Sequence, residues 1–265
     1  MARTKKLNVA DFPDWQEYYW TYQYNLARDF YVPMFEVWGI TGKGLKVVDV
    51  GCGDGGFTAA LADWGATCTG IEIKPFARKP YDNPRLKYAV QDITTADAPK
   101  IIGDDHGLVI LRDVIEHIPL PSKGAFLQSA VRLMKPGGRM LITFPPFYSP
   151  FGLHQQTILK SRLRKLPFLG LMPKMALDFL MAKAGETPAA MGEIDSIRES
   201  RMTIGGFRRL IKGQGLRILK EKHYLIRPSH EIRYGWRTTG ARWGRVPLLS
   251  EMFILGTAYL LAKET

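Results

Sequence analysis

The fold of this chain is decided by one short stretch, Val47-Val48-Asp49-Val50-Gly51-Cys52-Gly53-Asp54-Gly55-Gly56-Phe57. Its first part is apolar and β-branched, as in a buried parallel strand, and its second part is rich in glycine. Glycine lets the backbone turn sharply from a strand into a helix and lets a ligand approach the main chain closely. The stretch therefore predicts a strand over residues 45–50, a ligand-binding turn, and a helix over residues 57–64.

Strands and helices continue to alternate after this turn. Apolar runs predict strands over residues 67–73, 86–91, 108–112 and 139–144. A helix over residues 122–134 is predicted to stop at the turn Pro136-Gly137-Gly138. Strands separated by helices pair in parallel with right-handed crossovers, so that helices cover both faces of the sheet. The chain is therefore predicted to be an α/β protein with a doubly wound sheet.

The regular alternation is lost after residue 144 and resumes at Thr203, which we expect to cap a helix over residues 203–212. A structureless loop of this length is uncommon, so we expect a helical insertion or lid after the fifth strand. Further strands are predicted over residues 216–226 and 253–262. The predicted regions are an N-terminal aromatic helical cover (1–44), a ligand-binding core (45–144), the insertion or lid (145–202) and a C-terminal completion of the sheet (203–265).

Three acidic residues stand at the ends of the first three predicted strands: Asp49, Glu72 and Asp92. Ligands of open parallel sheets bind where such strands end, and an acid after the second strand can accept hydrogen bonds from ribose hydroxyls. Carboxylates repel phosphates and attract a cationic centre, which favours a nucleoside ligand with a sulfonium or ammonium group. A nicotinamide or flavin nucleotide is the alternative, because the glycine spacing also contains G-x-G-x-x-G.

Five motifs follow one another along this core: Asp49-Val-Gly-Cys-Gly-Asp-Gly, Gly70-Ile-Glu72, Gln91-Asp92-Ile93, Arg112-Asp113-Val-Ile-Glu-His117-Ile-Pro119 and Leu133-Met-Lys-Pro-Gly-Gly138. In this order they resemble the class I S-adenosylmethionine-dependent methyltransferases, in particular their small-molecule branch. The resemblance covers residues 45–144. It implies a Rossmann-like sheet of seven strands in which the last strand, residues 253–262, runs antiparallel between its neighbours.

The resemblance also implies a ligand and its binding residues. The cofactor would be S-adenosyl-L-methionine, with S-adenosyl-L-homocysteine as product. Its methionine part would lie on the glycine turn, its ribose on Glu72 and its adenine beside Asp92. The implied cofactor-binding residues are Asp49, Gly51, Cys52, Gly53, Glu72, Ile73, Asp92, Ile93, Arg112 and Asp113.

Two histidines are candidates for the catalytic base, because an acceptor that carries a proton needs one near the methyl group. His154 follows the fifth strand directly, and an imidazole near its reference pKa of about 6.5 can take a hydroxyl proton. His117 belongs to a Glu-His-Ile-Pro turn, which we interpret mainly as a structural turn near the cofactor. The predicted reaction is methyl transfer to a small or lipid-like acceptor, most favourably at oxygen.

The net charge of +12 is concentrated in residues 158–247, which hold 19 Lys and Arg residues and seven Asp and Glu residues. Such a region attracts anionic partners, or it is simply a solvated surface. An RNA methyltransferase is therefore one alternative, although no recognisable RNA-binding module is present. A non-catalytic cofactor-binding protein is another. The apolar residues 166–182 with their basic flank also allow contact with a membrane surface.

Two cysteines among 265 residues cannot form a disulfide framework, and neither has partners at zinc-ligand spacing. The N-terminus lacks the apolar run of a secretion signal, and no apolar stretch reaches the roughly 20 residues of a membrane span. We therefore expect a cytoplasmic enzyme without a metal ion. The acceptor and the oligomeric state do not follow from the sequence.

Overall fold

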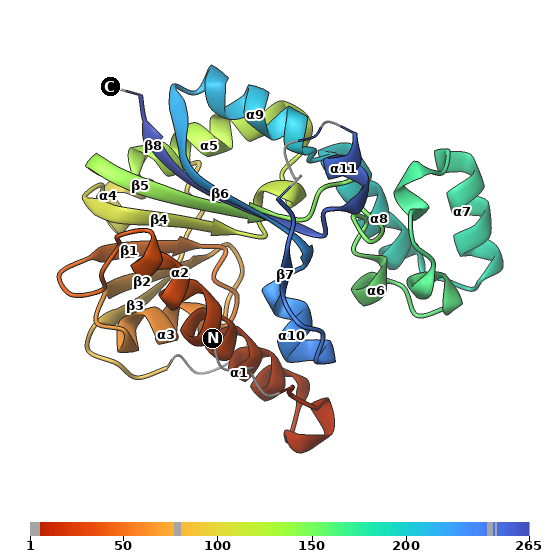
Figure 1. Cartoon of the computed structure of the whole chain (residues 1–265), viewed down its shortest axis with the longest axis horizontal. Coiled ribbons are helices and arrows are strands. Elements are labelled where there is room, and N and C mark those ends of the chain that lie inside the picture. Colours follow the sequence, from red (N-terminus) through yellow and green to blue (C-terminus); the bar gives the residue numbers. More distant parts are fainter. Residues whose placement is uncertain (1–5, 77–80, 243–245, 247, 265) are drawn as a thin grey trace.

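The computed structural model describes residues 6–76, 81–242, 246 and 248–264, and over these residues it forms one sheet between two layers of helices (Figure 1). The strands are ordered β3-β2-β1-β4-β5-β8-β6-β7 across the sheet. Their bounds are β1 Lys46–Val50, β2 Thr67–Glu72, β3 Leu86–Val90, β4 His106–Arg112, β5 Met134–Phe144, β6 Leu216–Ile226, β7 Thr239–Gly240 and β8 Gly256–Lys263. The helices are α1 Trp15–Leu26, α2 Val32–Val37, α3 Gly56–Asp63, α4 Ala98–Ile102, α5 Lys123–Arg132, α6 Gln155–Ile158, α7 Lys174–Lys183, α8 Pro188–Ser200, α9 Ile204–Gly213, α10 Pro228–Tyr234 and α11 Leu249–Phe253.

The predicted Rossmann-like topology is confirmed. Strands β1 to β5 are parallel to one another, and β8 lies antiparallel between β5 and β6. The sheet has eight strands rather than seven, because Thr239 and Gly240 pair with the end of β6 and form the two-residue strand β7. All the parallel strands end at the same edge of the sheet, and this edge holds the functional residues described below.

Two predicted boundaries were wrong. The last strand begins at Gly256, because residues 249–253 form α11 instead. The turn predicted at residues 136–138 lies inside β5, which already begins at Met134. There Gly137 has a φ of +70°, and the pairing with β4 shifts register between His106 and Leu108, so the chain bulges without leaving the sheet.

Alternation along the central strands gives each face of the sheet its own core. Val47 and Leu108 face one side with Phe57 of α3 and Leu26 of α1. Val48 and Val109 face the other side, where α5 and α9 pack, with Phe207 fully buried. Successive residues of a strand point to opposite faces of the sheet. When consecutive residues are all apolar and buried, both faces of the sheet are covered.

The predicted helical insertion after β5 is confirmed, and it has a small core of its own. α6, α7 and α8 project from one end of the sheet (Figure 1). Leu177 and Met181 of α7 pack against Ile194 and Ile197 of α8, and all four side chains are buried. Nothing in this core comes from β1 to β4, so the insertion is a helical unit attached to the sheet.

α1 lies unusually close to the glycine turn. A Cβ atom built on Gly56 would stand 2.3 Å from the carbonyl oxygen of Trp20, which is closer than any real contact. Glycine at the first position of α3 therefore permits the approach of the two helices. The preceding Gly55 has a φ of +80°, and this left-handed conformation is why the turn itself requires glycine.

We expect Gly56→Ala to lower the free energy of unfolding by about 1–3 kcal/mol, because the added methyl group forces α1 away from α3. Gly192→Ala in α8 is the matched control: no atom lies within 4 Å of its ideal Cβ, and alanine there should stabilise the protein by about 0.4–1 kcal/mol. Urea unfolding of both variants measures the difference. Equal effects would show that α1 does not pack closely on α3.

Candidate active site

A cavity of about 370 Å³ lies at the edge of the sheet where the parallel strands end. It is lined by the turn after β1, the end of β4, the loop and first residues of α6 that follow β5, and α10. Residues of α1 form the remaining wall. Cavities of this size are typical of small-molecule sites.

The glycine turn contributes Gly51, Cys52 and Gly53 to the cavity. Gly51 and Gly53 have φ values of +74° and +57°, which favour glycine. A Cβ on Gly53 would meet nothing within 4 Å, whereas one on Gly51 would stand 2.5 Å from Cγ2 of Val114. Open space beside the backbone of Gly53 is therefore available to a ligand, and Gly51 is required by packing.

Two of the predicted acids hold the turn in place. Asp49 is buried beneath it and accepts a hydrogen bond of 2.6 Å from Thr58 Oγ1, while burial raises the pKa of Asp49 to about 6. Glu72 accepts hydrogen bonds from the backbone N–H groups of Gly53 and Ile73, at 3.0 and 2.9 Å. Neither carboxylate lines the cavity, but Glu72 touches the turn that does.

The other predicted residues are divided between the cavity and its surroundings. Arg112 and Asp113 line the cavity together with the three turn residues. Asp92 accepts hydrogen bonds from the backbone and hydroxyl of Thr94, at 2.8 and 2.7 Å. Ile73 is exposed after β2, and Ile93 is buried in the core of the sheet. The structure thus brings five of the ten predicted cofactor residues into the cavity wall.

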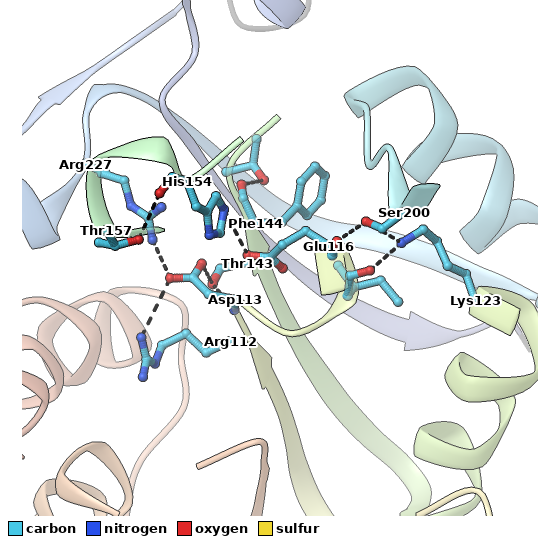
Figure 2. A network of polar contacts seen from close by, with 12 residues as sticks. Arg112, Asp113, Glu116, Lys123, Thr143, Phe144, His154, Thr157, Ser200 and Arg227 are labelled. Carbon is cyan, nitrogen blue, oxygen red and sulfur yellow. Dashed lines mark hydrogen bonds and ion pairs between the residues drawn. The ribbon is translucent and has the colours of Figure 1, made fainter. Parts of the chain in front are cut away.

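Asp113 is the electrostatic centre of the cavity (Figure 2). It has a φ of +55°, and its carboxylate forms ion pairs with Arg227 and, at 3.8 Å, with Arg112. Thr143 Oγ1 donates a hydrogen bond of 3.0 Å to Asp113 Oδ1. Burial alone would raise the pKa of Asp113, but Arg227, Arg112 and the Thr143 hydroxyl lower it to about 2.

The two candidate histidines meet at the cavity. Their rings stand edge to face with centroids 5.2 Å apart, and both line the cavity. His154 Nε2 is buried and lies 4.0 Å from Glu116 Oε1, and neither atom has a hydrogen-bond partner. Burial, followed by the charges of His117 and Arg227, lowers the pKa of His154 to about 3, while burial and Asp113 keep the pKa of Glu116 well above its usual range.

Glu116 is fixed by a network on its other side (Figure 2). The buried Lys123 side chain donates hydrogen bonds to the carbonyl oxygens of Ile115 and Ile118, and the Ser200 hydroxyl donates to the carbonyl oxygen of Glu116. Ser200 ends α8, so the insertion is fastened to the turn that follows β4.

The sequence did not reveal the wall formed by α10. Arg227, His230 and Arg233 all line the cavity and follow one another at intervals of three residues across the start of this helix. That spacing on a helix brings side chains to one face, so the signal was present. These residues were interpreted only as part of the basic region 158–247, and no helix was predicted there.

Some residues of the predicted aromatic cover line the cavity, whereas the apolar side chains of α7 in the insertion do not. Trp15, Tyr19 and Tyr22 of α1 line the cavity. The apolar side chains of α7 instead enter the insertion's own core or, like Met175 and Phe179, are exposed. Among the described residues, no helix is both long and apolar enough to cross a bilayer, and no group of three or more His, Cys, Asp or Glu residues is arranged to hold a metal ion.

A family model described as a methyltransferase domain matches residues 19–185. The chain therefore belongs to the S-adenosylmethionine-dependent methyltransferases. A ubiquinone biosynthesis O-methyltransferase from Pseudomonas savastanoi is 30% identical to this methyltransferase over 145 residues, which are 53% of this chain and 58% of the relative. The matched part is thus little more than half of that relative's length.

Solved structures share the fold of this methyltransferase. A SAM-dependent methyltransferase from Anabaena variabilis aligns with a TM-score of 0.54 and 16% identity, over 100% of this chain and 99% of the other. Magnesium protoporphyrin IX methyltransferase from Synechocystis, solved with bound S-adenosylhomocysteine, aligns with a TM-score of 0.50 and 16% identity, over 98% of this chain and 90% of the other. At this identity the likeness concerns the fold alone.

We expect Asp113→Asn to destabilise this methyltransferase by about 2 kcal/mol at pH 7, because the folded pKa of Asp113 is about 2 against an ordinary 3.8. A lowered folded pKa gives stability that is present above the unfolded pKa and lost as the pH falls through the folded one. The difference between wild type and variant in urea unfolding should be constant from pH 7 to 5 and shrink below about pH 4.

The exposed Asp104 provides the control, since Asp104→Asn at the opposite edge of the sheet should leave stability unchanged at every pH. An Asp113→Asn variant as stable as the wild type would contradict the assignment of Asp113 as the charge that holds Arg227.

Proposed function

We propose that this methyltransferase transfers a methyl group to a hydroxyl oxygen of a small or lipid-like acceptor bound in the cavity. The observation that carries the proposal is the pair formed by Glu116 and His154, because O-methylation needs a base beside the acceptor hydroxyl. The similarity to a ubiquinone biosynthesis O-methyltransferase supports the choice of oxygen.

The cavity fits S-adenosylmethionine on two observations. The space beside the backbone of Gly53 would be filled by a Cβ atom, so it suits the close approach of a ligand. Arg112 Nε and Gln23 Oε1 are buried without hydrogen-bond partners, and both residues line the cavity. The residues that would hold the cofactor are the backbone of Gly51 to Gly53, Glu72 at the ribose, and Asp92 with Ile93 at the adenine.

When bound, the cofactor supplies an electrophilic methyl group on a sulfonium. His154 would take the acceptor's proton: its Nε2 faces Glu116, which leaves Nδ1 for the cavity. The negative charge of Asp113 would then stabilise the imidazolium that forms, and Glu116, whose pKa is held well above its usual range, would orient the ring as a neutral carboxyl group. Arg227 and Arg112 would stabilise the negative charge on the acceptor oxygen before transfer.

Water must be excluded while the proton moves. Residues of α1 and the first residues of the insertion both line the cavity, so we propose that residues 1–44 cover it and that the insertion, residues 145–202, acts as its lid. His154 belongs to this insertion, and a closed lid would therefore bring the base to the acceptor. His117, which is more exposed, would support His154 rather than replace it.

Two other functions were considered from the sequence. Methylation of RNA is disfavoured, because Arg227 and Arg233 of the basic region line a cavity of about 370 Å³ rather than an extended stacking platform. A non-catalytic cofactor-binding protein would bind S-adenosylhomocysteine but methylate nothing. We retain a cytoplasmic location as part of the proposal, supported by two free buried cysteines.

We expect Glu72→Ala to weaken S-adenosylhomocysteine binding by roughly tenfold to a hundredfold, since hydrogen bonds to a charged group contribute about 1.5–3 kcal/mol. Isothermal titration calorimetry of the folded variant measures this. Asp104→Ala is the matched control, because this acid is exposed at the other edge of the same sheet and should bind like the wild type. Unchanged affinity of Glu72→Ala for S-adenosylhomocysteine would show that Glu72 does not bind the ribose.

We expect His154→Gln to lower kcat by about 10² to 10⁴ at pH 7 on a phenolic acceptor found in a panel of phenols and catechols. Affinity for S-adenosylhomocysteine should not change. The variant should recover as the pH approaches about 10, because a phenol then ionises without a base. His117→Gln should lose much less.

Loss of activity in His154→Gln without recovery at high pH would indicate a packing role for His154. Full activity at pH 7 would show that the base lies elsewhere. Tight binding of S-adenosylhomocysteine without turnover of any acceptor would favour the non-catalytic alternative.

A further inference from the structure

The wall formed by α10 presents a row of basic side chains to the cavity. Arg227, His230 and Arg233 all line it, and α10 lies beside α1 (Figure 1), whose Trp15, Tyr19 and Tyr22 line it as well. Arg227 forms an ion pair with Asp113. Apart from this pair, and among the described residues, none of the three forms a hydrogen bond or ion pair with the glycine turn or with the predicted cofactor residues.

The charges of the cavity wall do not balance. Of the described residues that line it, three are arginines and only Asp113 is acidic. Asp113 already serves both Arg227 and Arg112. S-adenosylmethionine itself carries a net positive charge, so a bound cofactor would increase the excess rather than cancel it. A cavity with this excess attracts an anion through a field that its low-dielectric walls strengthen.

Arg233 is the arginine that the protein leaves without an acidic partner. Among the described residues, no carboxylate forms an ion pair with it. Its guanidinium is held between two rings instead, 5.8 Å from the centroid of Tyr22 and 5.6 Å from that of Tyr234. Such contacts fix the planar group while its N–H donors stay available for two parallel hydrogen bonds to a carboxylate or phosphate.

His230 adds a second unsatisfied group next to Arg233. Its Nδ1 is buried and has no hydrogen-bond partner. The ring is held by Tyr234 and Trp236, at centroid distances of 5.5 and 6.0 Å. A buried nitrogen without a partner is energetically unfavourable, so a ligand atom that forms a hydrogen bond with it would be stabilising.

Building on the proposed methyl transfer, we infer that the acceptor carries an anionic group, a carboxylate or a phosphate, which Arg233 and His230 bind. The rings of Trp15 and Tyr19 of α1 would pack against the planar part of the acceptor. This places the reacting hydroxyl at one end of the acceptor, near His154, and the anionic group at the other. Arg233 and His230 are therefore the residues that select the substrate.

The test compares three catechol probes by calorimetry on the protein saturated with S-adenosylhomocysteine: 3,4-dihydroxybenzoate, its neutral amide 3,4-dihydroxybenzamide, and 3,4-dihydroxyphenyl phosphate. We expect at least one anionic probe to bind ten times more tightly than the amide, and the tighter one identifies the group as carboxylate or phosphate. In Arg233→Gln the preference should fall to twofold or less. Arg209→Gln, an exposed position on α9, should keep it in full.

Equal binding of the amide and both anions overturns the inference, and so does a preference that survives Arg233→Gln. Absence of binding by both anions at millimolar concentration overturns it as well. Because affinity for S-adenosylhomocysteine is measured in the same titrations, failure of the cofactor to bind is seen separately and counts against the proposed methyl transfer. If the cofactor does not bind but the preference for anions persists, the anion site of Arg233 and His230 is supported independently of the proposed methyl transfer.

Discussion

The partly buried carboxylate of Asp113 is the interaction on which the arrangement of the cavity depends. It joins three parts of the chain that are far apart in sequence: the end of β4 through its own backbone, β5 through Thr143, and the start of α10 through Arg227. A carboxylate loses its hydration on burial and is stable there only when charged and polar partners replace the water. Asp113 therefore fixes α10 over the cavity, and its φ of +55° is strain that these partners offset.

A second set of contacts sets the position of the base. Lys123 is almost fully buried, and its ammonium group donates hydrogen bonds to backbone carbonyls of the turn that contains Glu116. Burial lowers the pKa of Lys123 to about 8. Ser200 joins the same turn from the end of α8. The insertion is thereby attached to the core at its far end, so any closure of its first residues over the cavity must occur between β5 and α8. Glu116 lies on the turn held by these contacts, whereas His154 belongs to the segment that we propose as the lid.

The sequence predicted what local patterns determine and missed what tertiary contacts determine. The glycine turn and the strands up to β5 follow from residue types at short range, and so does the cap of α9 by Thr203. The antiparallel orientation of the last strand was implied only by the resemblance to class I methyltransferases. The role of α10 depends on the pairing of Arg227 with Asp113, 114 residues away, which no local pattern carries. For the same reason, composition could not tell whether the apolar residues of α7 contact an external partner or, as Leu177 and Met181 do, pack on Ile194 and Ile197.

The cavity also illustrates how a site departs from what stability alone would favour. A carboxylate beside Arg233, or a hydrogen-bond partner for His230 Nδ1, would stabilise the protein in the absence of ligand, yet neither is present among the described residues. Such departures occur where a ligand completes the interactions. If that ligand is anionic, it compensates both Arg233 and the positively charged cofactor, so each of the two ligands raises the affinity for the other. Linkage makes this coupling reciprocal. The coupling would favour the complex that holds both cofactor and acceptor, in which methyl transfer takes place, over the complexes that hold only one of them.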